Sequence, residues 1–100
     1  MFYIIEGIEN EKVVLSENEA KAAHEAHVAY VNMEIEKGRV KLAGPKAFGK
    51  GGFIILKAES ADEANAFVEA DPSFINGIQR YNITPWKIFD IAPGLESINE

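Results

Sequence analysis

Residues 16–38 read SENEAKAAHEAHVAYVNMEIEKG, and this stretch decides the fold because it is the longest helix that the sequence predicts. Ser16 is a suitable N-cap, and Glu19, three residues later, completes a capping box. Gly38 is suited to the position just beyond the helix, because glycine readily adopts the left-handed conformation found there. The helix is therefore predicted to run to about Lys37.

Two histidines lie on one side of this predicted helix. At about 100° per residue from Ala20, His24 falls at about 40° and His27 at about 340°. They share this arc with Val31 and Ile35, so the arc is expected to be the buried face. Histidine changes its charge near neutral pH, and an imidazole among aliphatic side chains needs a partner or a purpose. The pattern indicates a functional site on this face.

Four segments rich in β-branched and aromatic residues flank this helix and are predicted to be strands. They cover residues 2–8, 39–43, 53–58 and 79–90. Gly44-Pro45 is expected to stop the second strand. Pro85 interrupts the fourth and favours an edge position or a bulge, since proline cannot donate to a sheet.

A second helix is predicted after Ser60, again with a glutamate at the capping-box position, and it should end near Ala70. Asp71-Pro72 then starts a short helical turn, with the aspartate as N-cap and the proline in the first helical position. The order is β-α-β-β-α-β. It predicts an α+β, ferredoxin-like domain: a four-stranded antiparallel sheet with two helices on one face. Residues 1–92 are expected to form this single domain and residues 93–100 a loose tail.

The face of the predicted sheet that carries no helices is also apolar, so it is expected to pack against another surface. The runs Phe2-Tyr-Ile-Ile and Phe53-Ile-Ile-Leu are apolar on both sides of the strand, which is typical of strands buried on both faces. A large exposed apolar surface usually marks an interface. We expect a homodimer in which two sheets pack face to face.

Composition excludes several classes of protein. The net charge of −6 argues against a nucleic-acid partner, which calls for a lysine and arginine stripe, and against an anionic membrane surface. With no cysteine in the chain, disulfides, thiolate nucleophiles and cysteine zinc sites are ruled out. No signal peptide and no membrane span is predicted, so the cytoplasm is the expected location.

Several short motifs follow one another along the chain in a fixed order. His27-Val-Ala-Tyr-Val is followed, eighteen residues after the histidine, by a strand ending in Gly44-Pro45. Ser60-Ala-Asp-Glu-Ala, Ala70-Asp-Pro-Ser-Phe and Pro85-Trp86 come next. In this ordered set the chain resembles the YciI-like (YCII-related) family, and the resemblance covers roughly residues 1 to 91.

This resemblance implies a dimeric α+β barrel built from ferredoxin-like subunits, and a histidine–aspartate catalytic pair, which by position is His27 and Asp71. A related activity is a dehydrochlorinase that acts on a chlorinated hydroxyquinol. The chain departs from the family where members often carry arginines, because His24 and Thr84 stand at those positions. If those arginines bind an anionic substrate, the ligand of this chain differs.

The residues themselves leave alternatives open. His27 could be a core histidine bonded to a backbone carbonyl, and Asp71 could be an ordinary N-cap. His24 and His27 have a spacing that can hold a metal, but no third ligand accompanies them, so no metal is expected. We expect His24 to line the same cavity, with Tyr30 and Ser73 as further substrate-binding candidates. No glycine-rich elbow makes Ser73 a nucleophile.

Three functions compete. The first is an enzyme without a cofactor, in which His27 is the general base and Asp71 orients it. It would act on a small cyclic or aromatic-derived metabolite as a lyase, an isomerase or a hydrolase-type enzyme. The second is a dimeric module that binds a small metabolite without converting it. The third is a dimeric accessory domain that binds another protein.

Overall fold

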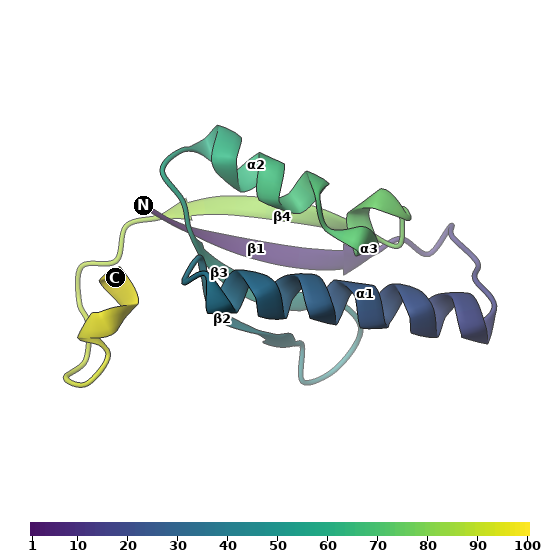
Figure 1. Ribbon diagram of the computed structural model, residues 1–100, viewed down its shortest axis with the longest axis horizontal. Helices are drawn as coiled ribbons and strands as arrows, with labels where there is room; N and C mark the ends of the chain where they lie inside the picture. Colours follow the sequence, from purple (N-terminus) through teal and green to yellow (C-terminus); the bar gives the residue numbers. More distant parts are fainter.

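A four-stranded antiparallel sheet, with strand order β2-β3-β1-β4, carries all the long helices on one face (Figure 1). The computed structural model describes residues 1–100. The strands are β1 (Phe2–Glu9), β2 (Val40–Pro45), β3 (Gly52–Lys57) and β4 (Gln79–Trp86). The helices are α1 (Glu17–Glu36), α2 (Ala61–Glu69), α3 (Pro72–Ile75) and the short 3-10 helix η1 (Glu96–Asn99). The predicted α+β, ferredoxin-like fold is confirmed.

Helix α1 begins and ends where its caps predict. The Ser16 hydroxyl accepts a hydrogen bond from the Glu19 backbone N–H, and the Glu19 carboxylate accepts one from the Ser16 N–H. This is the complete capping box. Lys37 is the C-cap, and Gly38 follows with a φ of 79°, which a residue with a Cβ rarely adopts.

Two strand ends differ from the prediction. Strand β2 does not stop before Gly44-Pro45, because both residues pair with β3. Strand β2 lies at the edge of the sheet, where a proline removes no hydrogen bond from a further strand. Strand β4 ends at Trp86 instead of Asp90, because its pairing partner β1 starts at Phe2, opposite Trp86. The edge position predicted from Pro85 is confirmed.

The main core lies between the helices and one face of the sheet. Alternate residues of the two central strands point into it, including Tyr3 and Ile5 of β1 and Leu56 of β3. Phe67 and Val68 of α2 cover them from the other side. Burial of these side chains supplies the dominant stabilisation of the fold, at about 1.5–3 kcal/mol for each large one.

The buried side of α1 is rotated from the side expected. Val31 and Glu34 are its two buried residues, whereas His24 is exposed and Ile35 is 45% exposed. The prediction that His24 and Ile35 lie on the buried face was therefore wrong. The helix packs against α3 and β2, and these contacts fix its rotation. His27 remains partly buried, at the edge between the two sides.

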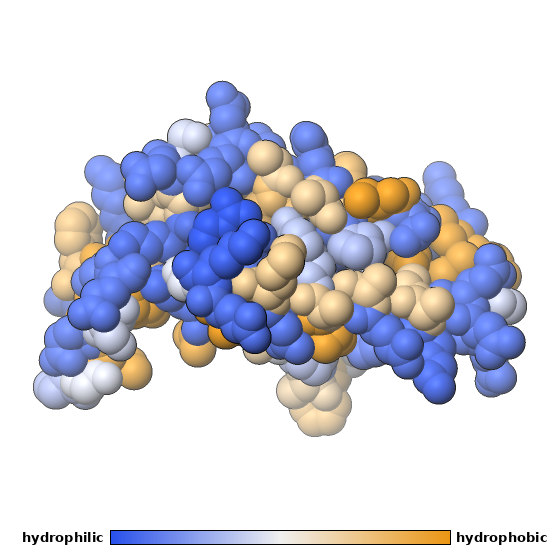
Figure 2. Space-filling view, in the orientation of Figure 1, coloured by the Kyte–Doolittle hydropathy of each residue, from blue (hydrophilic) through white to orange (hydrophobic).

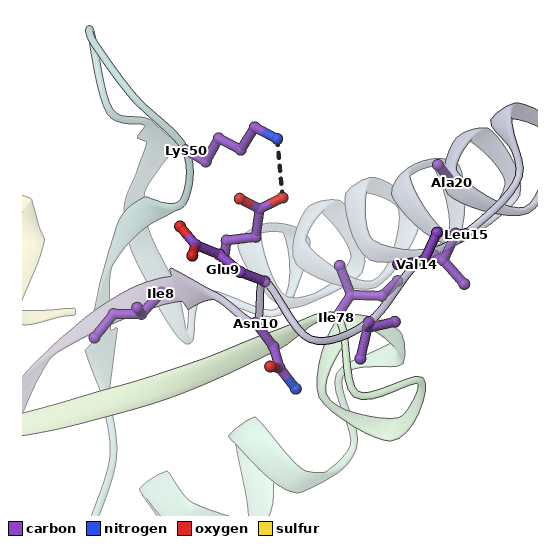
Figure 3. A pocket seen from close by; sticks show the side chains of 10 residues that line it. Ile8, Glu9, Asn10, Val14, Leu15, Ala20, Lys50 and Ile78 are labelled. Carbon is purple, nitrogen blue, oxygen red and sulfur yellow. Dashed lines mark hydrogen bonds and ion pairs between the residues drawn. The ribbon is translucent and has the colours of Figure 1, made fainter.

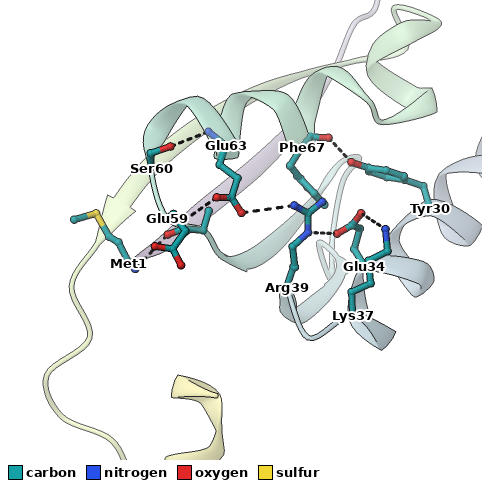
Figure 4. A network of polar contacts seen from close by, with 10 residues as sticks. Met1, Tyr30, Glu34, Lys37, Arg39, Glu59, Ser60, Glu63 and Phe67 are labelled. Carbon is teal, nitrogen blue, oxygen red and sulfur yellow. Dashed lines mark hydrogen bonds and ion pairs between the residues drawn. The ribbon is translucent and has the colours of Figure 1, made fainter.

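Glu34 is a charged residue on the buried side of α1, and an ion-pair network accommodates it (Figure 4). Its carboxylate accepts a 2.5 Å hydrogen bond from Arg39 Nε, and Lys37 Nζ lies 3.7 Å from its other oxygen. Arg39 also reaches Glu63 of α2, at 3.6 Å. The network ties α1 to the start of β2 and to α2.

The two faces of the molecule differ in character. Polar and charged groups dominate the helix-bearing face, with hydrophobic side chains visible between the helices (Figure 2). The opposite face of the sheet carries the alternate residues of each strand, such as Ile4 paired with Ile55. Leu42, which is 63% exposed, pairs with Ile55, and Phe53 is 45% exposed. We call this opposite surface the open sheet face.

Near the C-terminus, residues 96–99 form η1, and the Lys57 ammonium group contacts the Asn99 carbonyl. The domain boundary at residue 92 and the loose tail after it stay predictions. None of the helices combines the length and the hydropathy needed to cross a bilayer.

Candidate functional site

The structure brings together the two residues that the sequence selected as a pair. His27 Nδ1 lies 2.9 Å from one carboxylate oxygen of Asp71 and 3.0 Å from the other. His27 comes from the middle of α1, and Asp71 is the N-cap of α3, which lies beside α1. The Asp71 side chain is 1% exposed and the His27 side chain 21% exposed. The pair therefore has one member inside the protein and one at a surface.

Asp71 accepts two further hydrogen bonds. The Ser73 backbone N–H donates to Oδ1 at 3.0 Å, which is the N-cap bond of α3, and the Tyr81 hydroxyl donates to Oδ2 at 2.5 Å. An ionised carboxylate can only accept. His27 therefore carries a proton on Nδ1 and donates it to Asp71, which leaves Nε2 as the ring nitrogen available to a ligand.

Sequence reasoning missed Tyr81. This residue lies in β4, where an inward-facing tyrosine looks like any other core aromatic, so no local pattern distinguishes it. Burial, followed by the hydrogen bond to Asp71 and the charge of Asp71, raises the pKa of Tyr81 far above its ordinary value. The phenol therefore stays protonated at physiological pH and acts as a fixed donor.

A pocket of about 580 Å³ opens beside His27, between α1 and the β2–β3 hairpin. One wall is formed by α1, through His24, His27, Val31 and Ile35, which were predicted to face the core, and through Val28. The hairpin forms the other wall, and Gly7 and Tyr81 line it from β1 and β4. The residues that line it are His24, His27, Val28, Val31, Asn32, Ile35, Ala43, Gly44, Pro45, Gly49, Lys50, Gly51, Gly52, Phe53, Ile54, Gly7, Gln79 and Tyr81.

The remaining candidate residues occupy different places. His24 lines the pocket, one turn of α1 from His27. Tyr30 does not line it: its hydroxyl donates to the Phe67 carbonyl at 2.6 Å, and burial raises its pKa to about 12. Ser73 is buried behind Asp71 and is also absent from the pocket wall. Thr84 pairs with Ile4 on the open sheet face.

No cluster of three or more histidine, aspartate or glutamate side chains is arranged to hold a metal ion. The carboxylate nearest His27 is already bonded to three donors.

A larger hollow, of about 780 Å³, lies at the opposite end of β1 from Met1 (Figure 3). Its walls are mainly aliphatic and come from the linker before α1, the end of β1 and Ile78. Its one ion pair joins Lys50 Nζ to Glu9 at 3.1 Å, and Lys50 is well exposed. Within the linker, Val14 is 91% exposed, whereas Val13 and Leu15 are half-buried. Without a histidine or a buried polar group, this hollow is a weaker candidate.

The fold agrees with the family that the chain resembles. A model of the YCII-related domain matches residues 1–87, and the chain belongs to this family. One relative is the uncharacterized protein YjpA of Bacillus subtilis (strain 168), which is 29% identical over 62 residues. That match covers 62% of this chain and 73% of YjpA.

A solved structure with a known activity is also similar. It is the 5-chloro-2-hydroxyhydroquinone dehydrochlorinase TftG from Burkholderia phenoliruptrix AC1100, in complex with 2,5-dihydroxybenzoquinone. The two chains are 28% identical and superpose with a TM-score of 0.70, covering 87% of this chain and 94% of TftG.

Proposed function

We propose that this protein is a cofactor-independent enzyme that uses His27 as a general acid–base and Asp71 to orient it. The substrate is a small cyclic or aromatic-derived metabolite, and the reaction is of the lyase, isomerase or hydrolase type. The observation that carries this proposal is the hydrogen bond from His27 Nδ1 to a buried carboxylate, beside a pocket that His27 itself lines.

The chemistry follows from the geometry. Asp71 fixes the ring orientation and stabilises the imidazolium that forms when Nε2 takes a proton from a ligand. Proton transfer by a positioned group accelerates a reaction by about 10²–10⁴-fold. The aliphatic wall of Val28, Val31 and Ile35 suits the apolar edge of a ring.

Among the other candidates, His24 is proposed to contact the ligand directly, since it lines the pocket. Tyr30 and Ser73 would support the site from behind the pocket wall. The similarity to TftG supports a chlorinated or hydroxylated ring as the first substrate class to test.

The test uses 5-chloro-2-hydroxyhydroquinone, with chloride release as the measure of turnover. We expect His27→Ala and Asp71→Asn to lower turnover by at least about 10²-fold, because each removes part of the proton-transfer unit. Glu25→Gln, on an exposed position of the same helix, serves as the control. Circular dichroism checks that each variant is folded. Full activity in folded His27→Ala and Asp71→Asn would refute the assignment.

A second assay covers the non-catalytic alternative. Thermal shift with 2,5-dihydroxybenzoquinone measures binding, and a ligand at one hundred times its Kd stabilises the folded state by about 2.7 kcal/mol. Binding that depends on His27, without conversion of any ring compound tried, would assign the chain to the metabolite-binding modules.

We also propose that the protein is a homodimer in which two open sheet faces pack together. Leu42 and Phe53 are exposed there, together with Trp86 at 41%. Such a contact would remove these side chains from water and bury both faces of the sheet.

A further inference from the structure

We infer that Tyr81 is a positioning residue that sets the strength of the hydrogen bond between His27 and Asp71. This inference rests on the proposed role of that pair in proton transfer. Tyr81 reaches the site from β4, an element that contributes neither histidine nor aspartate, and its ring also lines the pocket.

Tyr81 and His27 compete for one carboxylate. The Tyr81 hydroxyl lies 2.5 Å from Asp71 Oδ2, and His27 Nδ1 lies 3.0 Å from that oxygen and 2.9 Å from Oδ1. Each donor draws negative charge toward itself and weakens the carboxylate as an acceptor for the other. With Tyr81 in place, Asp71 holds the imidazole in orientation but exerts a reduced pull on its proton.

The position of the Tyr81 ring depends on Gly7. Gly7 pairs with Tyr81 across β1 and β4. A Cβ at Gly7 would come within 3.2 Å of Tyr81 Cε1 and within 2.4 Å of Gln79 Oε1. The bare backbone of Gly7 therefore lets the phenol ring lie over β1 with its hydroxyl aimed at Asp71. A Cβ at this position would require the ring to give way by a few tenths of an ångström.

The phenol is a donor under all working conditions. Burial and the neighbouring Asp71 both raise its pKa, so it does not ionise near neutral pH. Ser73 supplies the third hydrogen bond through its backbone N–H, which no side-chain substitution removes. Tyr81 is thus a side chain that bonds directly to Asp71, and substituting it changes the carboxylate without altering His27.

The test is the NMR resonance of the His27 Nδ1–H proton in uniformly ¹⁵N-labelled protein. The chain has two histidines, so His24→Gln assigns the signals. We expect Tyr81→Phe to move the His27 Nδ1–H proton downfield, since Asp71 then bonds more strongly to the imidazole. Gly7→Ala should move it in the same direction by a smaller amount, because it displaces the ring without removing the hydroxyl.

Tyr3→Phe is the control. Tyr3 is also a buried tyrosine, but it lies in the main core and makes no hydrogen bond to His27 or Asp71, so loss of its hydroxyl should leave the His27 resonance in place. Asp71→Asn should abolish the downfield signal. If Tyr81→Phe does not fold, Gly7→Ala carries the test alone.

An unchanged His27 resonance in folded Tyr81→Phe or, failing that, folded Gly7→Ala would overturn the inference and leave Tyr81 as a packing residue. A downfield shift supports it whether or not a substrate is turned over. Suppose that Tyr81→Phe shifts the His27 resonance but His27→Ala keeps full turnover. The proposed function is then refuted, and the coupling between Tyr81 and Asp71 still stands.

Discussion

Asp71 performs two tasks at once. Its carboxylate caps α3 through the Ser73 N–H and at the same time holds the ring of His27. The sequence left open whether Asp71 is an N-cap or a partner for histidine, and in the structure it is both. An aspartate that caps a helix is fixed by the backbone, and this fixes the carboxylate to which the imidazole is bonded.

Glu34 is the second buried carboxylate, and its ionisation is predicted to contribute to stability. The hydrogen bond from Arg39, followed by the charges of Arg39 and Lys37, lowers the pKa of Glu34 in spite of its burial. A group with a lowered pKa in the folded state stabilises the fold above the ordinary glutamate pKa of about 4.3. This contribution is lost as the pH falls through the lowered value.

We therefore expect Glu34→Gln to reduce the free energy of unfolding at pH 7 by about 1.5–3 kcal/mol, the range for hydrogen bonds to charged groups. The difference from wild type should shrink as the pH falls below about 4. Urea unfolding at a series of pH values measures it. Glu36→Gln, exposed on the same helix, should cost little at any pH. A difference that stays constant down to acid pH would argue against this role of Glu34.

At the scale of the element, α1 uses two sides for two purposes. Val31 and Glu34 lie against the body of the protein, whereas His24, Val28 and Ile35 line the pocket. His27 sits where the two sides meet. Helix α1 thus contributes the catalytic imidazole of our proposal and one whole wall of the pocket.

Local features of α1 could be read from the sequence, and long-range ones could not. The capping box at Ser16 and the end at Gly38 depend on neighbouring residues, so both were predicted correctly. The rotation of the helix depends on packing against α3 and β2, so the buried arc was placed wrongly. Asp71 was selected through the family resemblance, while Tyr81 carried no local signal.

The capping box is expected to stabilise α1 measurably. Ser16→Ala removes the acceptor for the Glu19 N–H and should cost about 1 kcal/mol of unfolding free energy. Chemical denaturation provides the measurement. Asn18→Ala, an exposed change in the same turn, should cost less. Equal effects from the two substitutions would show that the cap is unimportant.

At the scale of the whole molecule, the sheet separates two unlike surfaces. The helix-bearing side holds the core and the pocket, and the open sheet face carries Leu42, Phe53 and Trp86 partly in solvent. A 100-residue domain buries only about 60–65% of its unfolded surface, so an additional interface would add substantially to its stability.

We predict a dimer at micromolar concentration, as measured by sedimentation velocity. Leu42→Lys places a charge on the open sheet face and should shift the protein toward monomer. Val14→Lys, which is also at a solvent-exposed aliphatic residue but lies in the linker before α1, should leave the dimer intact. A monomeric wild-type protein would refute the dimer.

The pocket wall on α1 has a consequence for how relatives of this protein diverge. His24, Val28 and Ile35 line the pocket and contribute little to the stability of the fold, since none of them is buried. Substitutions at these positions should therefore cost little stability, while the buried Asp71 keeps the partly buried His27 in place. Under the proposed function, relatives with this fold can thereby change the metabolite that they bind without first losing stability.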